Sequence, residues 1–251
     1  SLDDTPSSLV TKHSVRFGGS GLPGSDGTRY LRYPESGSEY SILGGNNTRM
    51  TISLWMKLES ITGYGVIVGK GSFRGLNPTS GQEYYIRAIP LGGNIYNLRS
   101  VMTRNSAVAG RGSVVEVISG DLEYGRWYHV VATYEVRTWT DPNGNVNTDI
   151  FFNNVLNIFV DGVEYDNSLT QQVSGDTDGD FGRMSSNFLP DVGHGPGGVP
   201  DSNNPFIIGA GNTTYGDDNI YEIQNVKIAD VAVWSAKLTN NEIFEIYSKS
   251  K

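Results

Sequence analysis

The chain has 251 residues, of which 37% are hydrophobic and 18% are charged. This length fits one large β domain or two ordinary domains, and this composition excludes a disordered chain. The net charge is −8 and there is no basic cluster, which argues against a nucleic-acid-binding surface and against binding to an anionic membrane. The lack of cysteine excludes disulfides, thiol catalysis and thiolate zinc sites, and no apolar run reaches the ~18 residues of a membrane-spanning helix.

Short strands are the main predicted elements along the chain. Residues 1–12 are polar, and we expect a flexible segment there. The stretch 50–59 then alternates clearly, with Ile52, Leu54 and Met56 on one face. Aromatic and β-branched residues between turn residues predict further strands at 13–17, 29–34, 65–71, 83–90, 94–103, 114–119, 125–136, 205–212 and 225–235.

Two local patterns near the end of the chain are more specific. Residues 156–166 predict a β-hairpin in which Asp161 and Gly162 form the two-residue turn, because a type I′ turn needs positive φ at both positions. Thr239 followed by Glu242 is a capping box, which predicts a short C-terminal helix.

The order of these elements indicates the fold class. Many short strands without alternating helices predict an all-β fold, an antiparallel two-sheet sandwich with a short C-terminal helix. We expect a single domain over residues 13–251, with insertions at about 137–154 and 170–204 that are rich in Gly, Asn and Asp.

Several segments in order resemble a known family. They are SVRFGGS…YLRYP, MTISLWMKLES with VIVGKG, GRWYHVVATYE with LNIFVDGVEYD, and NVKIADVAVWSAKLTNNEI. Together they are similar to the laminin-G-like branch of the concanavalin A-like lectin/glucanase superfamily. The resemblance implies a jelly-roll sandwich, a fold that hosts lectins, adhesion modules, glycosidases and virion proteins.

No catalytic residues are predicted. Glycosidases of this fold carry carboxylates at alternate strand positions, and the nearest pair here, Glu242 and Glu245, belongs to the predicted helix instead. His129 lies within a predicted strand, which favours a packing role, and His194 has no nucleophile motif nearby. We therefore expect a protein that is not an enzyme.

Acidic loops make calcium a candidate cofactor, because this ion takes six to eight oxygen ligands. One loop places Asp176, Asp178 and Asp180 at alternate positions between glycines. Asp and Asn are also what solvent-exposed turns prefer, so a loop without metal remains the alternative. A second loop offers the same pattern at Asp141, Asn143 and Asn145.

The family resemblance implies a third calcium site, where the first strand meets the last. Asp230 matches one acidic position of the closing motif. Gly18 and Ala229 stand where relatives often carry acids, and so depart from the pattern.

We expect the protein to act by recognising a ligand or a partner. The leading hypothesis is a non-catalytic recognition or adhesion module that binds carbohydrate, with calcium assistance, in an extracellular, cell-surface or virion-surface setting. An aromatic side chain stacks on the apolar face of a sugar ring, and polar groups in fixed positions bind the sugar hydroxyls. The alternative is a structural or decoration protein of a virion or surface assembly, acting through protein–protein contacts with itself or a partner. The candidate ligand-binding residues are Trp139, Phe181, Asn212, Tyr215, Asp217 and Asp218.

Overall fold

The computed structural model describes the strands, the C-terminal helix and some of their connections. These residues are 15–17, 30–33, 49–61, 65–70, 84–105, 112–135, 137–140, 146–149, 156–166, 172–174, 181–183, 206–212, 220–222 and 225–250. Among them, no helix is long and apolar enough to cross a membrane.

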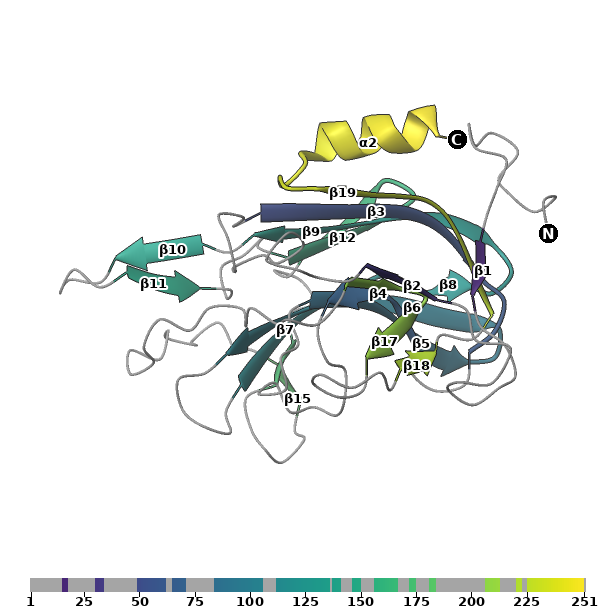
Figure 1. The fold of residues 1–251 in the computed structure, drawn as a ribbon, viewed down its shortest axis with the longest axis horizontal. Helices are drawn as coiled ribbons and strands as arrows, with labels where there is room; N and C mark the ends of the chain where they lie inside the picture. Colours follow the sequence, from purple (N-terminus) through teal and green to yellow (C-terminus); the bar gives the residue numbers. More distant parts are fainter. Residues whose placement is uncertain are drawn as a thin grey trace.

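Two antiparallel sheets face each other (Figure 1). The first sheet has the strand order β1–β19–β3–β9–β12–β13. Its strands, in that order, are Val15–Phe17, Val226–Trp234, Arg49–Leu58, Trp127–Glu135, Leu156–Val160 and Val163–Asp166.

The second sheet has the order β15–β14–β7–β6–β5–β4–β16–β2, and β8 (Leu122–Glu123) also pairs with β6. Its strands, in that order, are Phe181–Arg183, Gln172–Ser174, Gly112–Ile118, Ile95–Asn105, Tyr84–Gly92, Gly65–Lys70, Phe206–Ile208 and Leu31–Tyr33. Sequence pattern and structure thus agree on a β-sandwich.

Two further hairpins accompany the sheets. β10 (Arg137–Thr140) pairs with β11 (Val146–Asp149), and β17 (Ala210–Asn212) pairs with β18 (Ile220–Glu222). The stretches 137–154 and 170–204, which we expected to be insertions, therefore contain strands. β10 and β11 form a separate hairpin, whereas β14 and β15 extend the second sheet.

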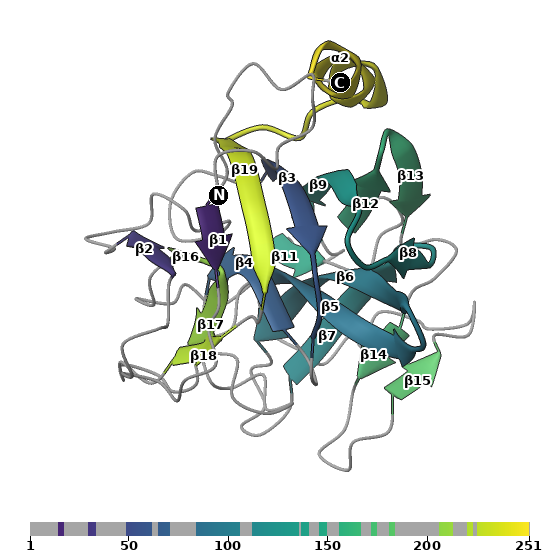
Figure 2. The same cartoon turned by 90° about the vertical axis from the view of Figure 1, so that its right-hand side faces the viewer.

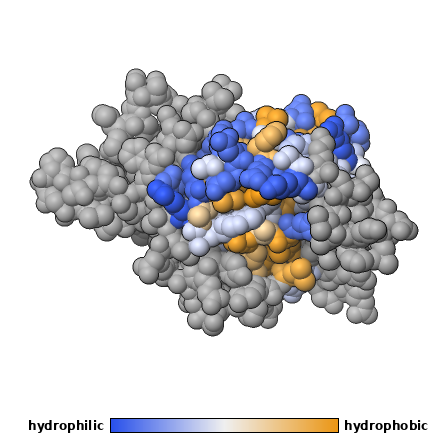
Figure 3. Space-filling view, turned by 90° about the horizontal axis from the view of Figure 1, so that it is seen from above, coloured by the Kyte–Doolittle hydropathy of each residue, from blue (hydrophilic) through white to orange (hydrophobic). Residues whose placement is uncertain are grey.

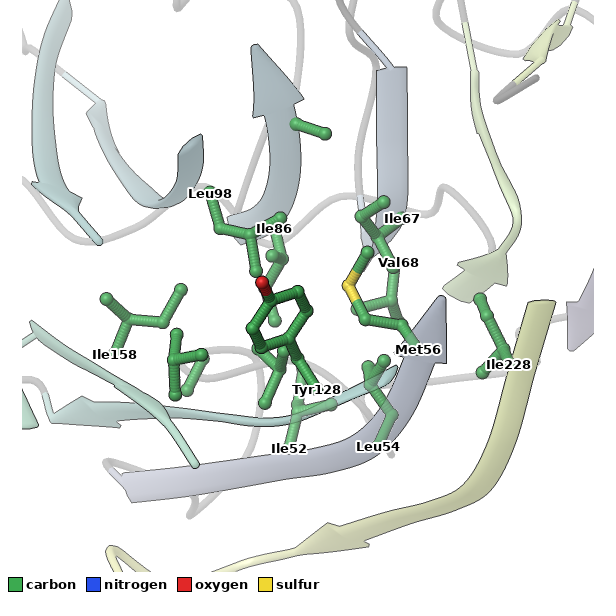
Figure 4. Close-up of a cluster of buried hydrophobic side chains, with 14 of the residues drawn as sticks. Ile52, Leu54, Met56, Ile67, Val68, Ile86, Leu98, Tyr128, Ile158 and Ile228 are labelled. Atoms are coloured by element: carbon green, nitrogen blue, oxygen red, sulfur yellow. The ribbon is translucent and has the colours of Figure 1, made fainter. Parts of the chain in front are cut away.

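The main core lies between the two sheets. Ile52, Leu54 and Met56 of β3 are fully buried and point toward the second sheet, where Met56 meets Ile67 and Val68 (Figure 4). The alternation predicted for residues 50–59 is thereby confirmed. Each such side chain contributes about 1.5–3 kcal/mol of hydrophobic stabilisation.

The outer face of the first sheet is covered by helix α2 (Asn240–Lys249), as Figures 1 and 2 show. The capping box of Thr239 and Glu242 is present, as predicted. Ile243 is fully buried against Val131 and Phe159 of the sheet. Seen from the helix side, hydrophilic side chains form a band with hydrophobic side chains on either side of it (Figure 3).

The hairpin turn between β12 and β13 also forms as predicted. Asp161 and Gly162 have φ values of 51° and 79°, as a type I′ turn requires. The Asp161 carboxylate accepts a 2.9 Å hydrogen bond from the backbone N–H of His129, which ties this turn to β9.

Candidate ligand-binding face

The outer face of the second sheet carries a group of polar side chains. Tyr84 and Ile86 of β5 enter the main core. Tyr85 lies between them and Arg87 follows Ile86, so both point to the opposite face of the sheet. Leu98 of β6 likewise enters the core, between two outward-facing neighbours. The outward-facing group on β5, β6 and β7, called here the outer-face cluster, consists of Tyr85, Arg87, Asn97, Arg99 and Glu116.

An ion trio forms the centre of this cluster. Arg87 Nη2 lies 2.8 Å from Glu116 Oε2, and Arg99 Nη1 lies 2.5 Å from Glu116 Oε1. The Glu116 side chain is 2% exposed, whereas the two arginine side chains are 14% and 20% exposed. The carboxylate therefore lies beneath the two guanidinium groups and fixes their positions through charge-assisted hydrogen bonds.

Two polar atoms beside the trio lack partners. Asn97 Oδ1 and Arg99 Nε are buried and have no hydrogen-bond partner in the part of the chain that the structure describes. Asn97 and Arg99 are alternate residues of β6, so their side chains lie on one face and their Cα atoms are about 7 Å apart along the strand. Leaving such an atom unsatisfied costs about 1–3 kcal/mol. An acceptor and a donor on this face are thus closed off from solvent without a described protein partner.

Apolar groups border the trio. Tyr85 packs against Val101 and Val66 in a small cluster separate from the main core. The guanidinium carbon of Arg87 lies 5.8 Å from the centre of the Tyr85 ring, in a cation–π contact. Burial raises the pKa of Tyr85, so its phenol stays neutral.

Gly69 of β4 permits the close approach of β5 at this point. A Cβ atom at Gly69 would lie 2.5 Å from Tyr85 Cβ and 2.7 Å from the Tyr84 carbonyl oxygen. No residue with a side chain fits there without displacing the backbone that carries Tyr85. Gly69 therefore helps to position Tyr85 within the outer-face cluster.

A serine–histidine pair occupies the other sheet, beneath helix α2. Ser53 Oγ lies 2.9 Å from His129 Nε2, and His129 is 2% exposed. The pair resembles a nucleophile with its base. However, His129 Nδ1 has no partner among the described residues that could orient the ring, and Tyr247 of the helix stacks on it. A buried packing role for His129, as the sequence predicted, is confirmed.

The structure describes the strand positions of three predicted ligand-binding residues. Trp139 lies in β10, opposite Asn147, in the hairpin at one end of the molecule (Figure 1). Phe181 lies in the edge strand β15, opposite Ser174. Asn212 lies in β17 and thus on a third element.

These strand positions do not bring the three residues onto one element. Tyr215, Asp217 and Asp218 lie outside the described residues. The prediction that this set forms a binding site therefore stays a prediction.

Sequence reasoning missed the outer-face cluster. Arg87, Arg99 and Glu116 are each the single charged residue of a strand segment, namely YYIRAIP, YNLRSV and VVEVI. A single charge inside such a segment needs a partner, because burying an unpaired charge is costly. That pattern could have paired the three residues, although it could not show which face they share.

The calcium prediction falls mostly on residues that the structure does not describe. Asp176, Asp178 and Asp180 lie between β14 and β15, and Asp141, Asn143 and Asn145 lie between β10 and β11, all outside the described residues. Within the described ranges, no group of three or more His, Asp or Glu side chains could hold a metal ion. Calcium binding by these loops thus stays a prediction.

Asp230 is described and lies near the junction of the first and last strands. β1 pairs with β19 from Val15 opposite Ile228, and Asp230 follows at an irregularity of β19, exposed and with a φ of 50°. Gly18 and the residues that follow it lie outside the described ranges. The prediction of a calcium site at this junction therefore stays a prediction.

The sequence matches a known protein family over most of its length. A laminin-G-type family model described as "Concanavalin A-like lectin/glucanases superfamily" matches residues 25–188. No curated protein matches the sequence.

Several solved structures are similar in fold. Trypanosoma rangeli sialidase is 17% identical with a TM-score of 0.42, over 80% of this chain and 22% of that one. The botulinum neurotoxin serotype C1 binding domain is 11% identical with a TM-score of 0.46, over 95% of this chain and 44% of that one. The binding domain of botulinum neurotoxin DC in complex with SialylT is 12% identical with a TM-score of 0.43, over 92% and 42%. The chain spans less than half the length of each of these structures.

Proposed function

The chain belongs to the concanavalin A-like lectin/glucanases superfamily, and from that premise we propose that it is a non-catalytic module that binds carbohydrate. The proposed setting is extracellular, at the surface of a cell or particle. The family alone does not decide between lectins, enzymes and structural proteins, so the proposal depends on the site.

The outer-face cluster is the observation that carries the proposal. Sugar hydroxyls are recognised by donors and acceptors held in fixed positions. The Arg99 side chain is 20% exposed, and its guanidinium carries five N–H donors, of which Nη1 binds Glu116. Glu116 holds the Arg99 guanidinium, so little side-chain entropy is lost when a ligand binds.

The neighbourhood of the cluster supports the same role. Glu116 in β7 lies opposite Gln172 in β14, and β14 pairs with β15, which begins at Phe181. The aromatic residue that we predicted to contact a ligand thus belongs to the same sheet as the cluster, two strands from Glu116. A ligand on this face could extend toward that edge.

The chemistry of the cluster favours binding without catalysis. A retaining glycosidase needs two carboxyl groups about 5–5.5 Å apart, one of them free to donate a proton. Glu116 is the only carboxylate of the cluster, and both of its oxygens accept hydrogen bonds from arginine. Such a carboxylate cannot act as acid or nucleophile while the trio is intact.

A glycan array probed with the purified protein tests the proposal, with and without calcium. We expect the wild type to be retained by a limited set of glycans and Arg99→Gln to lose that retention. Arg49→Gln is the matched control, because Arg49 also pairs with a glutamate, Glu135 at 3.0 Å, but belongs to the first sheet. No retention of the wild type under either condition would contradict the proposal, and a defined oligomer on size exclusion would then favour the surface-assembly alternative.

A further inference from the structure

We propose that helix α2 is an acid-released cover, which detaches from the outer face of the first sheet when His129 is protonated, while both sheets stay folded. Detachment would uncover Val131 and Phe159, on which the helix packs through Ile243. The switch is independent of carbohydrate binding, because the outer-face cluster belongs to the other sheet.

Few contacts hold α2 on the sheet (Figure 1). Within the helix, all of which the structure describes, Ile243 is the one fully buried residue. Near the C-terminal end, Tyr247 stacks on His129, and Trp55 Nε1 donates a 3.1 Å hydrogen bond to Ser250 Oγ. A detached helix of ten residues is marginal in water, so docking and helix formation should be lost together. An element with so little buried surface is suited to local opening.

A hinge for this movement lies between β19 and α2. β19 ends at Trp234, and the helix begins at Asn240. Thr51 of β3 holds the connection between them, because its Oγ1 donates to the Ala236 carbonyl oxygen at 2.7 Å and accepts from the backbone N–H of Leu238 at 3.0 Å. The pairing of β19 with β3 does not involve the helix. The sheet can therefore keep its strand order when α2 detaches.

His129 is poorly placed to carry a proton on both nitrogens while the helix covers it. An imidazolium donates from both nitrogens. Nε2 faces Ser53 Oγ, which can accept, but Nδ1 is buried without a partner in the described part of the chain. Burial accordingly lowers the pKa of His129 to about 4. Hydration of the ring after detachment would restore its ordinary pKa of 6.5, so the open form binds the proton more tightly and acid favours it.

The groups that the sheet places around His129 do not supply the missing acceptor. Asp161, in the turn between β12 and β13, accepts the backbone N–H of His129 with its Oδ1. Its Oδ2 lies 3.7 Å from Arg126 Nη2. From β3, Ser53 and Trp55 contact the imidazole, and neither carries a charge. Protonation of the ring is thus not matched by a carboxylate at Nδ1 among the described residues.

The charged groups of α2 are exposed and paired within the helix. Glu245 pairs with Lys249, and their side chains are 60% and 74% exposed. Glu242 accepts hydrogen bonds from Thr239, which lower its pKa. The capping box should therefore persist at pH 5, so that acid does not undo the helix from its N-terminus. Towards His129 the helix presents the ring of Tyr247.

Hydrogen exchange of backbone amides tests this inference at pH 7 and pH 5, with rates corrected for the intrinsic pH dependence of exchange. We expect α2 to be less protected than β3 at both pH values, because it opens locally. Its protection should fall about twentyfold from pH 7 to pH 5, as follows from the two pKa values of His129. Equal protection of α2 and β3 at pH 5 would show that the whole domain unfolds and would overturn the inference.

Two substitutions assign the effect to His129. His129→Gln does not titrate, so the protection of α2 should be the same at both pH values. Ile243→Ala removes the main docking contact and keeps the histidine. In that variant α2 should exchange faster at both pH values and still lose about twentyfold in protection on acidification.

Either variant can overturn the inference. A twentyfold loss that persists in His129→Gln would show that another group is the switch. His129→Gln also changes the buried contact with Ser53, and its thermal melt shows whether the fold is kept. Unchanged α2 protection in Ile243→Ala would show, independently of the histidine, that docking does not hold the helix.

Discussion

The side chains of Ser53 and His129 are joined by a 2.9 Å hydrogen bond beneath helix α2. Burial lowers the pKa of His129 from 6.5 to about 4, so the imidazole is neutral at pH 7. The ring also stacks on Tyr247, with ring centres 5.8 Å apart, and Trp55 lies 5.3 Å away. A charge at this position would be surrounded by aromatic groups and has no described acceptor on Nδ1.

Stability should therefore fall on acidification. The pKa of His129 is lower in the folded state than in the unfolded state, so its contribution is fully present above about pH 6.5 and is lost as the pH falls toward 4. Between pH 7 and pH 5 the loss should be about 2 kcal/mol. Urea unfolding at several pH values measures it.

His129→Gln is the matched comparison for this pH effect, because glutamine does not titrate. We expect its free energy of unfolding to vary less between pH 7 and pH 5 than that of the wild type. Identical pH profiles for the two proteins would show that His129 does not titrate as described.

A side chain at Gly69 should disrupt the outer-face cluster. Gly69→Ala places a Cβ atom 2.5 Å from Tyr85 Cβ, against backbone that cannot rotate away. Such overpacking lowers stability by about 1–3 kcal/mol, and the displacement of β5 should also weaken glycan binding. Thermal unfolding and the glycan array measure the two effects. Unchanged values in both would contradict the close approach of β4 and β5.

Removal of the Asn97 amide should preserve or raise stability. Asn97 Oδ1 is buried without a described partner, so Asn97→Leu removes an unsatisfied group and adds apolar contact. We expect an unchanged or higher melting temperature in thermal unfolding. A lower melting temperature would show that the amide stabilises the fold.

Calcium binding by the loop between β14 and β15 remains a prediction of the sequence. If the loop binds the ion only in the folded state, calcium at about 100-fold above its Kd should raise the melting temperature by about 5–10 °C. Asp176→Ala combined with Asp178→Ala should abolish the shift, whereas Asp121→Ala, an exposed control, should not. A shift that survives the double substitution would exclude this loop as the site.

Local patterns in the sequence were sufficient for several elements. The alternation along β3, the turn at Asp161 and Gly162, and the capping box of Thr239 and Glu242 are confirmed. Each depends on residues close together in the chain, where backbone geometry alone decides the outcome. The ordered motifs extended this local information to a sandwich of two sheets.

The sequence by itself thus determined the all-β class, the family and the side chains that enter the core, because a strand repeats every two residues whatever its neighbours are. Only the tertiary structure decided which charged residues meet. Glu116 bonds Arg87 and Arg99 across separations of 29 and 17 residues, through the order and register of β5, β6 and β7. It also decided that α2 covers one sheet and that the outer-face cluster lies on the other, because sheet packing joins segments that no local pattern connects.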